Sequence, residues 1–173
     1  LRSEEYQFIP ASTLVPQIPY YPEVEGIESR DAEEARELLA SAGLPAVSDL
    51  GTLRIAIPGG EEARRVAGLM KSAWEEALNV PVEITEIPYP QYFDALEEGE
   101  FTVGTVSWIA DFADPLSFLQ MWTSGSNLNN AGFSNEEFDS LIRASFDQAG
   151  NTRYETLAEA ERILLGTGVV LPI

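Results

Sequence analysis

The chain has 173 residues, of which 45% are hydrophobic, and a chain of this length and composition can bury the core of one domain or lobe. Its 29 acidic and 10 basic residues give a formal net charge of -19, which argues against nucleic acid and anionic membrane surfaces as partners. The sequence contains neither cysteine nor histidine, so it cannot build a Cys/His zinc site, a thiol nucleophile or a Ser-His-Asp triad.

The chain begins with a proline-rich stretch and continues with a helix. Four prolines within residues 1–30 predict an extended segment that lies across a surface and leads into a lobe over residues 31–173. The helix is predicted to begin after Asp31, because Asp31 and Glu34 have the spacing of a capping box. Gly43 is the expected end of this helix, since glycine is favoured just after the last helical residue.

Strands and helices alternate in the next part of the chain. Short apolar runs predict strands over residues 53–57, 82–87 and 101–108, and helical periodicity predicts helices over residues 61–78 and 90–98. In the longer helix, the residues expected to face the sheet are Val66, Leu69, Met70, Ala73 and Ala77. Because right-handed crossovers join such strands in parallel, this order predicts an α/β fold with a mainly parallel sheet flanked by helices.

Two further helices are predicted in the last third of the chain. Ser134 with Glu137, and Thr152 with Glu155, have the spacing of capping boxes, and each pair precedes an apolar run. The last residues, 169–173, have the composition of the beginning of a strand.

Two acidic residues follow the third predicted strand, and they have different explanations. Asp114 precedes Pro115 and an apolar run, which is the pattern of a helix N-cap followed by proline at the first helical position. Asp111 has no such role, and open α/β sheets bind their ligands at the carboxyl ends of parallel strands. Asp111 is therefore the leading candidate for binding a cationic group, and an Asx turn that ends the strand is the structural alternative.

Two further residues are weaker candidates for binding a ligand. Trp108 either lines a ligand cleft or is a core aromatic, because tryptophan buries well in both places. Asn130 lies in a loop over residues 124–132, whose Ser/Asn/Gly composition is also typical of an ordinary loop. The sequence indicates no metal site, no cofactor and no catalytic residue, and it contains no EF-hand loop.

Three motifs carry a resemblance to a known family. They are D-x-E-x-A-x-x-L-L-x-x-A-G over residues 31–43, W-x-A-D-F-x-D-P over residues 108–115 and F-D-x-L-I over residues 138–142. In type, order and spacing they resemble the solute-binding proteins of peptide-type ABC importers, the oligopeptide- and dipeptide-binding group. The resemblance covers essentially the whole chain and implies a truncated part, the carboxyl-terminal lobe, of a longer two-lobed protein.

The resemblance implies a type II periplasmic-binding-protein-like lobe and a function in transport rather than catalysis. A peptide would be trapped between this lobe and the missing amino-terminal lobe, and then delivered to the membrane subunits of an ABC transporter. The protein would work in the periplasm or at the outer face of the cell membrane, with a lipid anchor in the full-length protein as a further expectation. No cofactor is implied.

The resemblance also implies roles for individual residues. Asp111 matches the acid that receives the α-ammonium group of the peptide. The backbone at Ser107 and Ile109, on either side of Trp108, matches the groups that pair with the peptide main chain. Two alternatives stay open: a family member that binds a sugar, a metal complex or another solute, and a hydrolase that uses Asp111 and Asp114 as a carboxylate pair.

Overall fold

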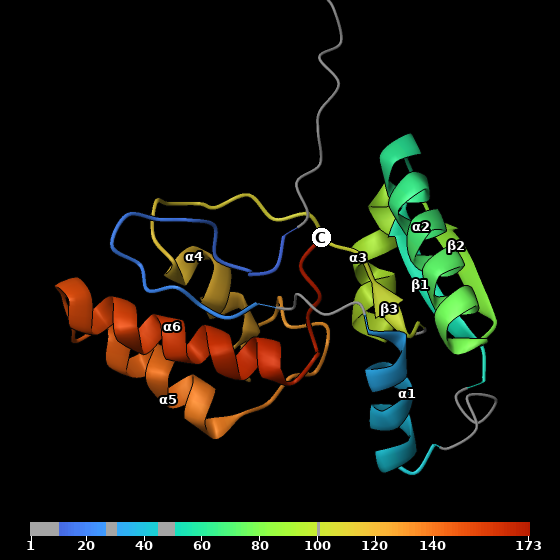
Figure 1. The fold of residues 1–173 in the computed structure, drawn as a ribbon. Coiled ribbons are helices and arrows are strands. Elements are labelled where there is room, and N and C mark those ends of the chain that lie inside the picture. Colours follow the sequence, from blue (N-terminus) through green and yellow to red (C-terminus); the bar gives the residue numbers. More distant parts are fainter. Residues whose placement is uncertain (1–10, 27–30, 45–50, 100) are drawn as a thin grey trace, which may run out of the picture. The chain divides into compact units, whose positions relative to one another are not determined.

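The computed structural model describes residues 11–26, 31–44, 51–99 and 101–173, and these residues form two compact units (Figure 1). The sheet unit contains the described residues between 31 and 107. The helical unit combines residues 11–26 with Trp108–Ile173.

A three-stranded parallel sheet forms the centre of the sheet unit, with strand order β2-β1-β3. Leu53 pairs with Val82 and Ile55 pairs with Val103, so β1 is the central strand. The parallel sheet and its helices confirm the predicted α/β fold. The elements of this unit are, in chain order, α1 (Ala32–Ser41), β1 (Leu53–Pro58), α2 (Glu61–Leu78), β2 (Val82–Ile87), α3 (Tyr89–Glu98) and β3 (Val103–Gly104).

Successive residues of β1 are buried on opposite faces of the sheet, because side chains alternate along a strand. Ile55 and Ile57 are buried in a cluster with Ala67 of α2. Ala56, between them, is buried against Tyr92 and Leu96 of α3. Two helices therefore cover the two faces of this small sheet.

The third strand is much shorter than the predicted span of residues 101–108. The backbone N–H of Thr105 still donates to the Ala56 carbonyl oxygen at 3.2 Å, but the strand itself ends at Gly104. Beyond it, Val106 is 51% exposed, so the apolar run is not a buried strand as predicted. The prediction was wrong because β3 lies at the sheet edge and pairs only with β1, which leaves the following apolar residues without a covering layer.

Helices α1 and α2 are present as predicted, but the buried face of α2 differs from the prediction. Asp31 caps α1 as expected, since its Oδ1 accepts the backbone N–H of Glu33 at 2.8 Å. In α2, however, the fully buried residue is Ala67, whereas Leu69 is 61% exposed. Small apolar residues lie on several sides of α2, so periodicity alone did not determine which side meets the sheet.

The described residues of the helical unit form four helices, which pack around one large hydrophobic cluster and a smaller one. The described part of the predicted extended segment, residues 11–26, contains neither helix nor strand and runs beside α6 (Figure 1). Residues 1–10 and 27–30 of that prediction lie outside the described residues. The helices are α4 (Leu116–Leu119), η2 (Gln120–Trp122), α5 (Glu136–Ser145) and α6 (Gly150–Gly166).

A buried carboxylate fastens the extended segment to α6. Glu161 is completely buried, and its Oε1 accepts the backbone N–H groups of Leu14 at 2.9 Å and Val15 at 2.8 Å. Its Oε2 accepts the hydroxyl of Tyr21 at 2.9 Å. Burial raises the pKa of the Glu161 carboxyl above its usual range, although these three hydrogen bonds act in the opposite direction.

The starts of α5 and α6 differ from the predicted capping boxes. Asn135, rather than Ser134, caps α5, because its Oδ1 accepts the backbone N–H of Phe138 at 2.9 Å. Serine and asparagine are comparable N-caps, so two adjacent candidates cannot be separated by type alone. Helix α6 begins at Gly150, which places Thr152 inside its first turn. Residues 169–173, predicted as the beginning of a strand, have no strand structure.

Candidate functional site

The segment from Trp108 to Pro115 is an irregular loop that leads into α4. Asp111 lies in this loop seven residues after β3 ends at Gly104, so it does not directly follow a strand as predicted. Its side chain is exposed, and its backbone N–H donates to the Oγ of Ser117 at 2.9 Å. No described residue forms a hydrogen bond or an ion pair with its carboxylate. The loop thus holds the backbone of Asp111 and leaves its negative charge available to a ligand.

The other predicted residues of this region lie on or beside the same loop. Trp108 is half-buried, and its Nε1 donates to the backbone oxygen of Ser117 at 2.8 Å. Ile109 is 88% exposed. Ser107 is also exposed and is the last residue of the sheet unit. Trp108 and Asp111 therefore share Ser117 as their hydrogen-bond partner.

Asp114, in contrast to Asp111, is fully engaged. Its Oδ1 accepts the backbone N–H of Leu116 at 2.9 Å, so Asp114 binds the start of the helix, although the N-cap residue of α4 is Pro115 and not Asp114 as predicted. Its two carboxylate oxygens also accept hydrogen bonds from Arg153 of α6, at 2.6 and 2.9 Å. Burial by itself raises the pKa of the Asp114 carboxyl, but the hydrogen bonds from Arg153 and Leu116 outweigh it and lower the pKa below its usual range.

Asn130 lies in the loop between η2 and α5, where its neighbour has the clearer structural role. The Nδ2 of Asn129 donates to the carbonyl oxygen of Phe133 at 2.7 Å, and its Oδ1 accepts the Phe133 N–H at 3.1 Å. Asn130 is half-buried, and its backbone N–H donates to the Leu128 carbonyl oxygen at 3.0 Å. Asn129 therefore holds the loop closed, and Asn130 remains a prediction as a ligand contact.

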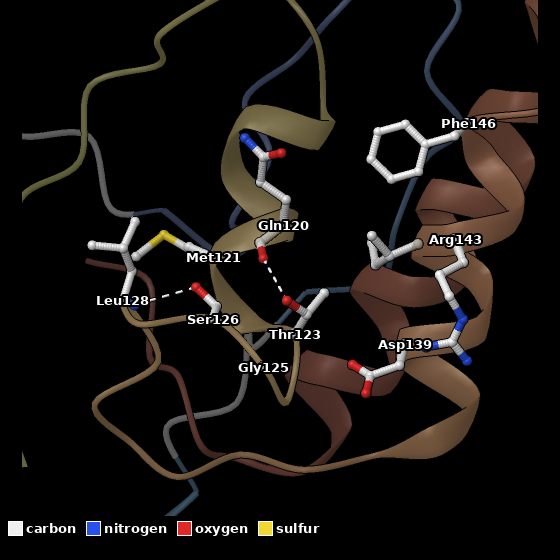
Figure 2. Close-up of a pocket in the computed structure, with 10 residues that line it drawn as sticks. Gln120, Met121, Thr123, Gly125, Ser126, Leu128, Asp139, Arg143 and Phe146 are labelled. Atoms are coloured by element: carbon white, nitrogen blue, oxygen red, sulfur yellow. Dashed lines mark hydrogen bonds between the residues drawn. The ribbon is translucent and has the colours of Figure 1, made fainter.

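A hollow of about 530 Å³ lies in the helical unit, and sequence reasoning missed it (Figure 2). Its polar side chains have partners: Asp139 accepts the backbone N–H of Ser124 at 3.0 Å, and Arg143 donates to Ser140 at 2.9 Å. No single motif marks this hollow, because packing brings together residues from η2, the following loop and α5. The lining residues are Gln120, Met121, Thr123, Gly125, Ser126, Leu128, Asp139, Ile142, Arg143 and Phe146.

The described residues offer no site for a metal ion. Within these ranges, no group of three or more aspartate or glutamate side chains is close enough together to hold one. None of the helices described is both long enough and apolar enough to cross a membrane. What the loop from Trp108 to Pro115 offers a ligand is the exposed carboxylate of Asp111 beside aromatic and aliphatic side chains.

The family model described as "Bacterial extracellular solute-binding proteins, family 5 Middle" matches residues 5–130. The chain is 28% identical to the oligopeptide-binding protein OppA of Bacillus subtilis, over 95% of this chain and 32% of that protein. It is 32% identical to the periplasmic oligopeptide-binding protein OppA of Salmonella typhimurium, over 82% of this chain and 26% of that protein.

A solved structure shows the same fold. The structure of the Escherichia coli murein tripeptide binding protein MppA matches with a TM-score of 0.85 and 25% sequence identity. The match covers 95% of this chain and 33% of the MppA chain. The chain thus spans about a third of the length of the relatives that it matches.

Proposed function

Because the chain belongs to the bacterial extracellular solute-binding proteins of family 5, we propose that it is one lobe of a receptor that captures peptides for an ABC importer. The names of the two OppA relatives, which are oligopeptide-binding proteins, support peptides as the ligand class. Residues 31–173 form the ligand-binding lobe in this proposal, and a second lobe belongs to the rest of the full-length protein. The receptor acts in the periplasm or at the outer face of the membrane, where a lipid anchor holds it near the membrane subunits of the transporter.

The observation that carries this proposal is the exposed carboxylate of Asp111, which pairs with no residue of the described ranges, on a loop whose backbone is held. It receives the α-ammonium group of the peptide. Two unit charges 4 Å apart attract by about 1 kcal/mol in water and by about 4 kcal/mol at an effective dielectric constant near 20. Closure of a second lobe over the site excludes water, so the contact discriminates best in the closed receptor.

The remaining predicted residues supply the contacts that do not depend on the peptide sequence. The exposure of Ser107 and Ile109 supports a role for their backbone groups in hydrogen bonding to the peptide main chain, as in strand addition. Trp108 forms a wall beside them, and Asn130 contributes an amide. Side chains of the peptide then need only roomy, hydrated space, which suits a receptor for varied peptides.

The two alternatives differ in how well the site supports them. A receptor for a non-peptide solute would use the same carboxylate for another cationic group, since the fold alone does not determine the ligand. A carboxylate-pair hydrolase needs two acids that are free to titrate, and the Asp114 carboxylate is held by Arg153 and by the Leu116 N–H. We therefore propose that the protein is a binding protein and not an enzyme.

The proposal is tested by titration calorimetry of the full-length protein with trialanine and with N-acetyl-trialanine. We expect trialanine to bind more tightly, and Asp111→Asn to weaken its binding about tenfold or more, equivalent to about 1.4 kcal/mol, and to remove the preference for the free amino terminus. Asp147→Asn is the matched control, because Asp147 is another exposed aspartate of the helical unit. Equal binding of both peptides to the wild-type protein would contradict recognition of the ammonium group, and an unchanged preference in Asp111→Asn would remove Asp111 from the site.

The 173-residue chain alone provides a second comparison. It contains one lobe of the proposed receptor, so trialanine should release heat with the full-length protein and almost none with the chain by itself. Equal affinity of the two proteins would contradict the proposal that the peptide is held between two lobes.

A further inference from the structure

Ser117 is completely buried in α4, although serine is mostly found at protein surfaces. Both of its oxygen atoms accept hydrogen bonds from the preceding loop. Its Oγ accepts the backbone N–H of Asp111 at 2.9 Å, and its carbonyl oxygen accepts the Nε1–H of Trp108 at 2.8 Å. Its own backbone N–H donates to the carbonyl oxygen of Asp114 at 3.0 Å. One buried residue thus holds the loop at three points.

The position of Ser117 is itself supported from outside the loop. Asp114, which closes the turn before α4, is bound by both terminal nitrogens of Arg153. The Nε of Arg153 donates in addition to the carbonyl oxygen of Ser145 at 3.0 Å, so this guanidinium connects the start of α4 to α5 and α6. The turn that leads into Ser117 is therefore fastened to two other helices.

Fixing the loop backbone matters because Asp111 lies at the surface and none of the described residues pairs with its carboxylate. Without the bond to Ser117, the backbone of Asp111 would sample several conformations, and a ligand would have to order it on binding. Ordering a loop or side chain on association reduces affinity, whereas a group held in its binding position beforehand avoids that loss.

We propose that Ser117 is a positioning residue that holds Asp111 and Trp108 in place for recognition of a ligand's ammonium group. The inference rests on the proposed function, since Asp111 is its binding group. Ser117 does not contact the ligand in this proposal. It acts through the backbone of Asp111 and the indole of Trp108.

The test compares Ser117→Ala with a matched control, Ser145→Ala, in the full-length protein. Ser145 is also a completely buried serine, but its Oγ donates to Ile142 within its own helix, at 2.8 Å, and does not contact the loop. Hydrogen exchange followed by mass spectrometry reports the protection of residues 108–117. Calorimetry reports the ratio of affinities for trialanine and N-acetyl-trialanine, which a loss of global stability alone does not change.

We expect Ser117→Ala to accelerate exchange in residues 108–117 and to lower the affinity ratio about tenfold, the effect of losing one hydrogen bond that orients a charged group. Ser145→Ala should do neither. In an Asp111→Asn background, Ser117→Ala should lower the ratio no further, because the two residues act through one contact. If the alanine variant does not fold, Ser117→Cys replaces the hydroxyl by a larger group that is a weaker acceptor, and it should change the ratio in the same direction.

Three results overturn the inference. The first is an affinity ratio in Ser117→Ala that is as high as in Ser145→Ala. The second is unchanged hydrogen exchange of residues 108–117 in Ser117→Ala. The third is an equal decrease of the ratio in the presence and in the absence of Asp111. If trialanine binds the wild-type protein, any of these results shows that Ser117 has no role in recognition and leaves the proposed function intact. Failure of the wild-type protein to bind trialanine is a separate result that overturns the proposed function as well.

Discussion

Replacement of Arg153 by alanine should destabilise the helical unit strongly, because this side chain makes three hydrogen bonds to two elements. Its guanidinium binds both oxygens of Asp114, at 2.6 and 2.9 Å, and the carbonyl oxygen of Ser145 at 3.0 Å. Arg153→Ala leaves the Asp114 carboxylate without its ion partner and the Ser145 carbonyl without a donor. An unpaired, partly buried carboxylate is more costly than the loss of the contact alone.

The expected loss follows from the exposure of the pair. The side chains of Arg153 and Asp114 are 18% and 24% exposed, so the pair lies between a surface ion pair and a fully buried one. Exposed pairs contribute about 0–1 kcal/mol, whereas breaking a buried pair costs about 3–5 kcal/mol. We therefore expect Arg153→Ala to lower the free energy of unfolding by about 2–3 kcal/mol.

The matched control is Arg162→Ala on the same helix. Arg162 pairs with Glu159 at 2.9 Å and donates to the carbonyl oxygen of Glu23 at 3.2 Å, but the Arg162 and Glu159 side chains are 41% and 53% exposed, so the expected loss is about 1 kcal/mol or less. The assay is urea unfolding of the 173-residue chain followed by tryptophan fluorescence in a Trp74→Phe background, because Trp108 and Trp122 are then the tryptophans of this chain and both lie in the helical unit.

The pH dependence of the same measurement provides a second test. The pKa of Asp114 is lowered from its ordinary value of 3.8, so the unfolded chain binds the proton more tightly than the folded one. The contribution of the pair is therefore present above that value and is lost as the pH falls through the lowered pKa. Equal losses for Arg153→Ala and Arg162→Ala at neutral pH, or a difference between them that is as large in strong acid as at neutral pH, would refute this reasoning.

Three further predictions concern closely packed positions. The pKa of Glu161 is raised above its ordinary value of 4.5, so the wild-type protein should lose stability relative to Glu161→Gln as the pH rises through the folded-state pKa. Thermal unfolding in a pH series measures this loss, with the exposed Glu155→Gln as the control. A stability difference between wild type and Glu161→Gln that does not change with pH would contradict the prediction. Tyr92→Phe should lower the free energy of unfolding by about 1–2 kcal/mol, because the buried hydroxyl donates to the carbonyl oxygen of Ala56 at 2.9 Å and accepts the backbone N–H of Thr105. An unchanged midpoint of chemical denaturation would show that these hydrogen bonds do not stabilise the sheet unit. Gly104→Ala should lower the melting temperature of the sheet unit, since a Cβ there would lie 2.6 Å from a side-chain atom of α3, and an equal or higher melting temperature would contradict the close packing.

Much of the fold and part of the site follow from local sequence signals. The bounds of α2 and β2 agree with the predicted residues 61–78 and 82–87, because strong periodicity and adjacent turn residues mark both ends. The three motifs identified the family, and the family model confirms that resemblance. The match to MppA confirms the predicted type II periplasmic-binding-protein-like class. The motif around Asp111 also marks the loop in which the Asp111 carboxylate is exposed and has no partner among the described residues.

The sequence by itself determined the types and order of most elements, the family and the candidate acid, because these depend on propensities and spacings over a few residues. Only the tertiary structure decided that Asp114 is held by Arg153, that Glu161 binds the segment around Leu14, and that Ser117 holds the loop. The first two contacts join residues 39 and 147 positions apart. A side chain's partner at such a separation depends on how whole elements pack, and no local pattern contains that information.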